Sequence, residues 1–174
     1  RAVLFGVHDF KHLNALDGIR HNAPALRKIL TTDDVGGLSD THCVVVPPDS
    51  TQGDVLDAVY DAAAEAEHLL LVYYAGHGHF GGDGRHLLLA TAASHLQRSH
   101  HSVPYEHIRA LVADSKARHR IVIIDCCFSG LALHMGDQPV EITTGPNFEI
   151  QGACVLTSAA QTQRSLCLPE GSVF

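Results

Sequence analysis

The sequence predicts one α/β domain, in which a mostly parallel sheet is covered by helices on both faces. Short apolar runs alternate along the chain with stretches whose apolar residues recur at helical spacing. The runs are apolar without interruption, as expected for strands buried on both faces of a parallel sheet. A chain of 174 residues with 45% hydrophobic and 18% charged side chains suits a single compact core and excludes a disordered chain.

Local signals divide the chain into these elements. Strands are predicted at residues 2–7, 43–46, 69–75, 87–90 (a minor strand), 121–124 and 154–157, helices at 24–30, at 51–67 and from Pro104 onward, and loops at 8–20, 94–102 and 135–150. Asn22 can cap the first helix, and Thr51 and Asp54 have the spacing of a capping box for the second. Pro104 suits the start of the third helix, because its fixed φ is compatible with a first helical turn.

Two of the most apolar strands lead into reactive side chains. The strand at 69–75 is followed by Gly76 and His77, and the strand at 121–124 by Asp125, Cys126 and Cys127. Functional groups of such sheets gather at the carboxyl ends of the strands, so neighbouring strands would bring these groups together. A thiol is mostly protonated at neutral pH, and a nearby imidazole can take its proton.

These strand ends carry a family resemblance. Residues 73–78 (YYAGHG) resemble the histidine motif of caspases, metacaspases and bacterial caspase-like peptidases, and residues 125–130 (DCCFSG) resemble the metacaspase cysteine motif. His77 and Cys127 are 50 residues apart, close to the spacing in caspases. The first strand, residues 16–18 (LDG) and Asn22 are similar to the start of bacterial caspase-like domains. The resemblance covers nearly the whole chain and implies a caspase-like α/β/α sandwich that acts as a cysteine endopeptidase.

The resemblance implies a role for each motif residue. The attacking Cys is the third residue of the cysteine motif, so Cys127 is the expected nucleophile and His77 its base. Cys126 is then a small buried residue, since successive strand side chains point to opposite faces. The backbone N–H groups of Gly78 and Cys127 are candidate donors for the oxyanion. No third member of the Cys127/His77 dyad is evident in the sequence.

Substrate preference is expected to depend on Asp125. The matching Asp of metacaspases lines the first specificity pocket, whereas caspases proper carry Gln there and cut after Asp. A carboxylate attracts Arg or Lys, so cleavage after a basic residue is expected. Asp17 is a second candidate for this pocket. As alternatives, Asp125 could cap a turn and Asp17 could be an ordinary turn residue, and residues 91–94 (TAAS) lack the carboxylate of many relatives, which leaves cleavage after Asp open.

Other chemistries fit the sequence less well. His77, His79 and His86 could bind zinc, but the chain has no CxxC or HExxH spacing, and no acidic cluster has the spacing of calcium ligands. No metal or other cofactor is therefore predicted. Adjacent cysteines are poorly placed for a disulfide switch, and the Gly-rich loop at 76–84 lacks the Lys-Ser/Thr ending of a phosphate cradle. A non-catalytic adaptor of the same fold and a small-molecule amidase stay open as alternatives.

Composition indicates the setting and the partners. A net charge of −7 argues against nucleic acid, and no apolar run approaches the length of a membrane span. An odd count of five cysteines without paired spacing argues against a secreted disulfide framework, and no signal peptide is visible, so a cytoplasmic location is expected. The expected partner is a protein or peptide substrate.

The ends of the sequence suggest a piece of a longer protein. The chain starts at Arg1 without Met and stops at Phe174, after residues 172–174 (SVF), which resemble the beginning of the small-subunit part of relatives. A small-subunit-like fragment or a fused sensor domain is therefore an expected partner. By resemblance, a role in bacterial stress or antiviral defence is expected.

Overall fold

The computed structural model describes residues 1–82, 86–127, 149–158, 167–168 and 171–172. Its helices are α1 (Asn22–Thr31), α2 (Gln52–Glu65) and α3 (Tyr105–Asp114), with short 3-10 helices η1 (Asp17–Ile19), η2 (Asp40–His42) and η3 (Ser99–His101). Its strands are β1 (Ala2–Gly6), β2 (Cys43–Val46), β3 (Leu69–Phe80), β4 (Leu87–Leu89), β5 (Val103–Pro104), β6 (His119–Cys127), β7 (Cys154–Thr157), β8 (Cys167–Leu168) and β9 (Gly171–Ser172). Of the helices in the described part, none is long and apolar enough to cross a membrane.

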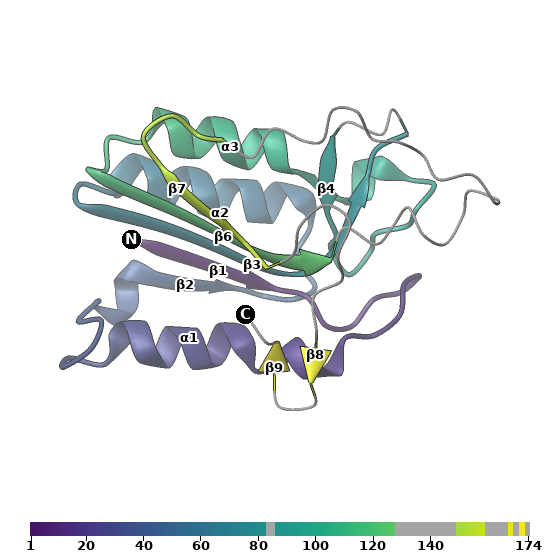
Figure 1. Ribbon diagram of the computed structural model, residues 1–174, viewed down its shortest axis with the longest axis horizontal. Coiled ribbons are helices and arrows are strands. Elements are labelled where there is room, and N and C mark those ends of the chain that lie inside the picture. The colour runs from purple at the N-terminus through teal and green to yellow at the C-terminus, as the bar shows by residue number, and fades with distance from the viewer. Residues whose placement is uncertain (83–85, 128–148, 159–166, 169–170, 173–174) are drawn as a thin grey trace.

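The sheet is mostly parallel, as predicted. β1 pairs in parallel with β2 and β3, β3 with β6, and β6 with β7 (Figure 1). The last residues of β3 pair antiparallel with β4, which pairs antiparallel with β5. These strands form one seven-stranded sheet, and β8 and β9 form a separate two-stranded antiparallel sheet.

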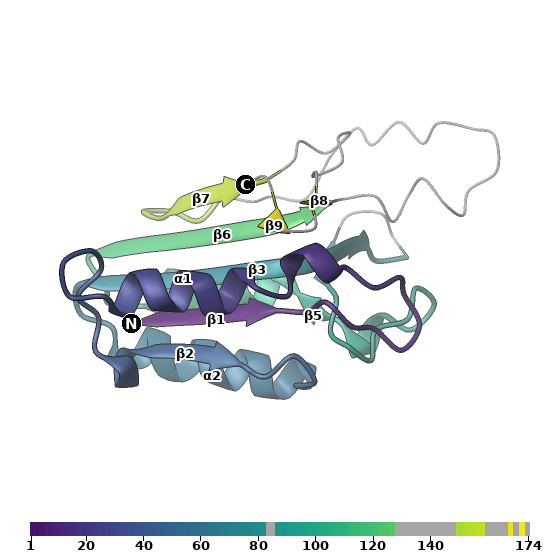
Figure 2. The ribbon, with the colours of Figure 1, turned by 90° about the horizontal axis from the view of Figure 1, so that it is seen from below.

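The helices lie on both faces of the sheet for a topological reason. From β1 the chain moves to β2 on one side and then to β3 on the other side of β1. Because crossovers between parallel strands are right-handed, the two connecting helices must lie on opposite faces. α1 covers one face, and α2 and α3 lie together on the other (Figures 1 and 2).

Alternation along the strands divides the core into two clusters. One cluster lies on the α2 and α3 side and includes Phe5, Tyr74 and Ile124, whose side chains are almost completely buried. The other lies on the α1 side and includes Leu4 and Tyr73. Neighbouring residues of one strand therefore face different helices, which decides where each motif side chain points.

Two strands extend further than the sequence predicts. The predicted strand at 69–75 continues as β3 to Phe80, and the predicted strand at 121–124 is β6, which ends at Cys127. β1 pairs with β3 only as far as Ala75, after which β4 supplies hydrogen-bonding partners for the rest of β3. His77 therefore lies within a strand and not in a loop.

Three local predictions need correction or stay open. Asn22 does not cap α1, because the N-cap residue is His21 and the Asn22 side chain instead contacts Tyr73 and Asp125. The loop at 94–102 is not simply exposed, since its two terminal serines are completely buried. Most of the loop predicted at 135–150 lies outside the described residues.

The capping box at the start of α2 is confirmed: the Thr51 hydroxyl accepts from the Asp54 N–H, and the Asp54 carboxylate accepts from the Thr51 N–H.

Candidate active site

The His77 side chain is held by the loop that follows β1. His77 is half-buried on β3, and its Nε2 atom lies 2.9 Å from the backbone oxygen of Asn14. A carbonyl oxygen only accepts hydrogen bonds, so Nε2 is the donor in this contact, and the matching neutral tautomer has its lone pair on Nδ1. The Phe10 ring lies against the imidazole, with ring centroids 4.8 Å apart and planes inclined by 49°. The imidazole is thus fixed in both tautomer and orientation by one loop.

The backbone of His77 is fixed by Tyr74. The Tyr74 hydroxyl lies 2.7 Å from the His77 oxygen and 3.0 Å from the Ala90 oxygen, and the Ala90 N–H donates to the same His77 oxygen at 2.9 Å. Burial raises the pKa of the Tyr74 phenol well above its usual value, so the phenol stays protonated and remains a donor. Gly76 leaves room for this hydroxyl, because a Cβ atom there would lie 2.8 Å from Tyr74 Cζ.

The register of β3 and β6 brings the two motifs together. His77 and Cys127 are paired positions on these neighbouring parallel strands. Paired positions on adjacent strands lie about 4.8 Å apart and fall on the same face of the sheet. The side chain of Cys127 lies outside the described part, so the backbone register alone relates it to His77. Cys126 is 2% exposed and belongs to the core cluster on the α2 and α3 side, as expected for a small buried residue.

The N–H group of Gly78 faces β6. The backbone oxygens of Ala75 and His77 accept hydrogen bonds from Val7 and Ala90, on the side of β3 where β1 and β4 lie. The N–H and C=O groups of a strand residue point to one side, and the side alternates from residue to residue. The Gly78 N–H group consequently points to the opposite side, toward the strand that ends in Cys127.

Asp125 is buried and lines a groove beside α1. Its side chain is 4% exposed, and its Oδ2 atom lies 3.5 Å from both the Tyr73 hydroxyl and the Asn22 amide nitrogen, which are 3.2 Å apart. The groove has a volume of about 270 Å³ and is lined by Asn22, Ala25, Leu26, Ile29, Tyr73, Ile123 and Asp125. Its walls are mainly apolar and its polar groups gather at Asp125. Such a site suits a long side chain with an apolar stem and a charged end.

Asp17 is not brought into this groove. It begins η1, its side chain is 83% exposed, and its carboxylate lies 3.7 Å from the guanidinium of Arg20. Asp17 is not one of the described residues that line the Asp125 groove.

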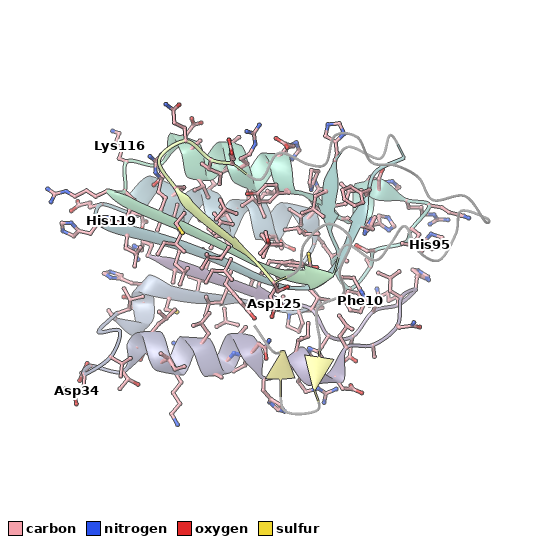
Figure 3. The ribbon with its side chains drawn as sticks, viewed as in Figure 1. Phe10, Asp34, His95, Lys116, His119 and Asp125 are labelled. Atoms are coloured by element: carbon pink, nitrogen blue, oxygen red, sulfur yellow. The ribbon has the colours of Figure 1, made fainter. Side chains whose placement is uncertain are left out.

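Phe10 and Asp125 both lie toward the end of the sheet where β3 and β6 finish, whereas His119 lies at the other end (Figure 3).

His79 belongs to a buried polar chain behind His77. Its Nε2 atom lies 3.3 Å from the Ser102 hydroxyl, which lies 2.8 Å from the Ser94 hydroxyl, while Nδ1 has no hydrogen-bond partner in the part of the chain that the structure describes. Burial, and secondarily the neighbouring His77, lowers the pKa of His79 and keeps its ring neutral. Within the described residues no group of three or more His, Cys, Asp or Glu side chains could hold a metal ion.

Two groups that contact His77, the Asn14 oxygen and the Phe10 ring, could not be predicted from the sequence. Every residue carries a backbone oxygen, so nothing in the sequence distinguishes Asn14 from its neighbours as the hydrogen-bonding partner of His77. Phe10 is an isolated aromatic residue in a segment predicted only as a loop. Both are brought to His77 by the path of the chain after β1.

Comparison with known proteins identifies the family of the chain. A family model described as the caspase domain matches residues 1–168, which include both strands that lead to His77 and Cys127. No curated protein matches the chain significantly. The match covers nearly the whole chain and coincides with a mostly parallel sheet flanked by helices. The chain therefore belongs to the caspase domain family of cysteine peptidases.

Proposed function

We propose that the chain is an endopeptidase domain in which Cys127 attacks the peptide bond and His77 is the base. The observation that carries this proposal is the pairing of His77 with Cys127 on adjacent strands. A thiol and an imidazole on neighbouring strand positions are close enough for direct proton transfer. The Asn14 oxygen supports the assignment, because it occupies Nε2 and leaves Nδ1 as the nitrogen that takes the thiol proton.

The reaction follows from these groups. His77 removes the proton of Cys127, and the thiolate attacks the substrate carbonyl to give a tetrahedral oxyanion. The proposed donors to this oxyanion are the N–H groups of Gly78, which faces β6, and of Cys127. The imidazolium of His77 then protonates the leaving amine, which leaves a thioester on Cys127. Water hydrolyses the thioester, with His77 again as the base, and restores the thiol.

We further propose that cleavage follows Arg or Lys of the substrate. Asp125 lies two positions before Cys127 on the same strand, and therefore on the same face of the sheet. The groove at Asp125 offers apolar walls for the stem of a basic side chain and a carboxylate for its charge. Neutral donors, the Tyr73 hydroxyl and the Asn22 amide, approach Asp125 at its Oδ2 atom. Asp17, exposed and outside the groove lining, adds no support, so the preference rests on Asp125 alone.

Fluorogenic peptides with Arg, Lys or Asp at the cleaved position test both proposals. Wild type is compared with Cys127→Ala, His77→Ala and the matched control Cys126→Ala. We expect cleavage after Arg and Lys that is abolished in the first two variants and retained in the third. Equal loss from Cys126→Ala and Cys127→Ala would contradict the choice of nucleophile. A caspase-fold adaptor, the alternative from another class, would show no cleavage in any form.

Asp125→Asn isolates the specificity proposal. The substitution keeps size and hydrogen bonding and removes the charge, so kcat/KM for Arg and Lys peptides is expected to fall by roughly 10- to 100-fold, about the weight of a charge-assisted hydrogen bond. Cleavage after Asp in wild type, unchanged by Asp125→Asn, would keep the mechanism and overturn the pocket. A cytoplasmic location is proposed on the odd count of five cysteines without paired spacing. A small-subunit-like or sensor partner and a defence role are proposed on the family resemblance alone.

A further inference from the structure

A nine-residue loop directly after β1 holds His77 through two different contacts. The loop, residues 8–16, is closed at its base by a hydrogen bond from the Leu16 N–H to the His8 oxygen at 2.8 Å. It is anchored on its far side by the Lys11 N–H, which donates to the Ala92 oxygen at 2.9 Å. The same loop presents the Asn14 oxygen to Nε2 of His77 and the Phe10 ring to the face of the imidazole.

Phe10 links the imidazole to the core of the domain. Its half-buried side chain packs against the core cluster on the α2 and α3 side, together with Phe80 and Ala92. The hydrogen bond to Asn14 fixes one atom of the His77 ring but leaves rotation about that bond open. A ring packed 4.8 Å away at an inclination of 49° restricts this rotation, because turning the imidazole would drive it into the phenyl group.

The Phe10 ring also attracts the positive charge that His77 acquires during the proposed reaction. During the proposed reaction His77 becomes an imidazolium, and the electron-rich face of an aromatic ring attracts a cation within about 6 Å. Leucine at the same place would fill much of the volume but has no such quadrupole. Tyrosine would retain both the shape and the quadrupole of the ring.

We propose that Phe10 is a positioning residue for His77, holding the imidazole against the Asn14 oxygen and stabilising the imidazolium that forms when Cys127 is ionised. The proposal rests on the proposed function, because it assigns Phe10 a part in that reaction. The role is indirect, since Phe10 acts through His77. The two contacts of His77 differ in what they require. Any residue at position 14 could accept the hydrogen bond through its backbone oxygen, whereas the contact at position 10 requires an aromatic side chain.

Peptide hydrolysis is measured from pH 5 to 10 for wild type, Phe10→Leu, Phe10→Tyr and Phe80→Leu. Phe10→Leu is expected to lower kcat roughly 2- to 30-fold with KM unchanged. The alkaline limb of the kcat/KM profile should move to lower pH, because the imidazolium that protonates the leaving amine is lost earlier. Phe10→Tyr should keep both kcat and the alkaline limb at their wild-type values. Phe80→Leu is the matched control: Phe80 is also half-buried against the same cluster, but lies on the opposite face of β3 from His77.

A readout without substrate separates this inference from the proposed function. ¹⁵N NMR of the histidine rings, with His77→Gln to assign the signal, reports which ring nitrogen of His77 carries the proton. Wild type should show the proton on Nε2, Phe10→Leu a mixture of tautomers, and Phe10→Tyr the wild-type pattern. If no form cleaves peptides, the proposed function fails and the spectra alone decide this inference. An unchanged tautomer and an unchanged alkaline limb in Phe10→Leu would overturn it.

Discussion

Gly76 is the position where one added carbon atom should disturb the proposed active site most directly. A Cβ atom there would lie 2.8 Å from Tyr74 Cζ and would contact the Tyr74 hydroxyl oxygen even more closely. Tyr74 is 1% exposed, and its hydroxyl is held between the backbone oxygens of His77 and Ala90. The ring cannot swing into solvent, so Gly76→Ala must displace the hydroxyl from the His77 oxygen.

The expected cost follows from packing. Forcing an additional carbon into a filled core costs about 1–3 kcal/mol of unfolding free energy. For a chain of this size that corresponds to a loss of roughly 2–12 °C in melting temperature. Tyr74→Phe removes the closest atom and the hydrogen bond, at a cost of about 0.5–1.5 kcal/mol. In that background the phenyl ring is no longer tied to two carbonyl groups and can yield, so Gly76→Ala should cost about 1 kcal/mol less than in wild type.

Urea unfolding followed by circular dichroism measures the four corners of this double-mutant cycle. Gly82→Ala is the matched control, because a Cβ on Gly82 meets no atom of the described residues within 4 Å. Peptide hydrolysis in native buffer should fall in Gly76→Ala, since the backbone of His77 shifts with the lost hydrogen bond. Strict additivity of Gly76→Ala and Tyr74→Phe, or a Gly76→Ala protein as stable as Gly82→Ala, would refute the reasoning.

Three further predictions concern other parts of the structure. Gly53→Ala should raise the unfolding free energy by about 0.5–1 kcal/mol in urea titrations. Gly53 is exposed in α2, and among the described residues its Cβ would meet only Thr51 Oγ1, at 3.7 Å; a loss of stability would contradict this prediction. Burial lowers the pKa of His79 in the folded chain, so the folded state binds fewer protons than the unfolded state and stability declines as pH falls below about 6.5. His79→Asn should make that decline shallower, by up to about 1.4 kcal/mol per pH unit, and an unchanged slope in unfolding series at several pH values would argue against it. Asn14→Ala should leave kcat within about twofold, because the backbone oxygen remains; a large loss would mean that the Asn14 side chain contributes.

Elements with local signals were predicted well from the sequence. The capping box of Thr51 and Asp54 placed the start of α2, because both partners lie within four residues of each other. The continuous apolar runs at 69–75 and 121–124 identified the central strands β3 and β6. The sequence left open whether these two runs are neighbours in the sheet; the structure pairs them, and this pairing underlies the site.

Features that depend on distant partners were not predicted. The end of β3 at Phe80 is set by its pairing with β4, and no local signal in residues 76–80 marks it. Asn22 has the residue type of a helix cap, yet its amide lies beside Tyr73 and Asp125 because the first turn of α1 faces these strands. Asp17 was the second candidate beside Asp125 for the specificity pocket, and burial separates the two: Asp17 is exposed, whereas Asp125 is buried and lines a groove.

The lengths of the strands explain why the site lies where it does. β1 has 5 residues and its neighbour β3 has 12, so β3 projects beyond the carboxyl end of β1. The chain reverses direction across the sheet at β1, and such switch points leave a crevice at the carboxyl ends of the strands. The loop after β1 must cross this crevice to reach α1, and the projecting part of β3 that it meets contains His77. A longer β1 would pair with His77 and remove the contacts of Phe10 and Asn14, so the early end of β1 is itself a requirement of the proposed mechanism.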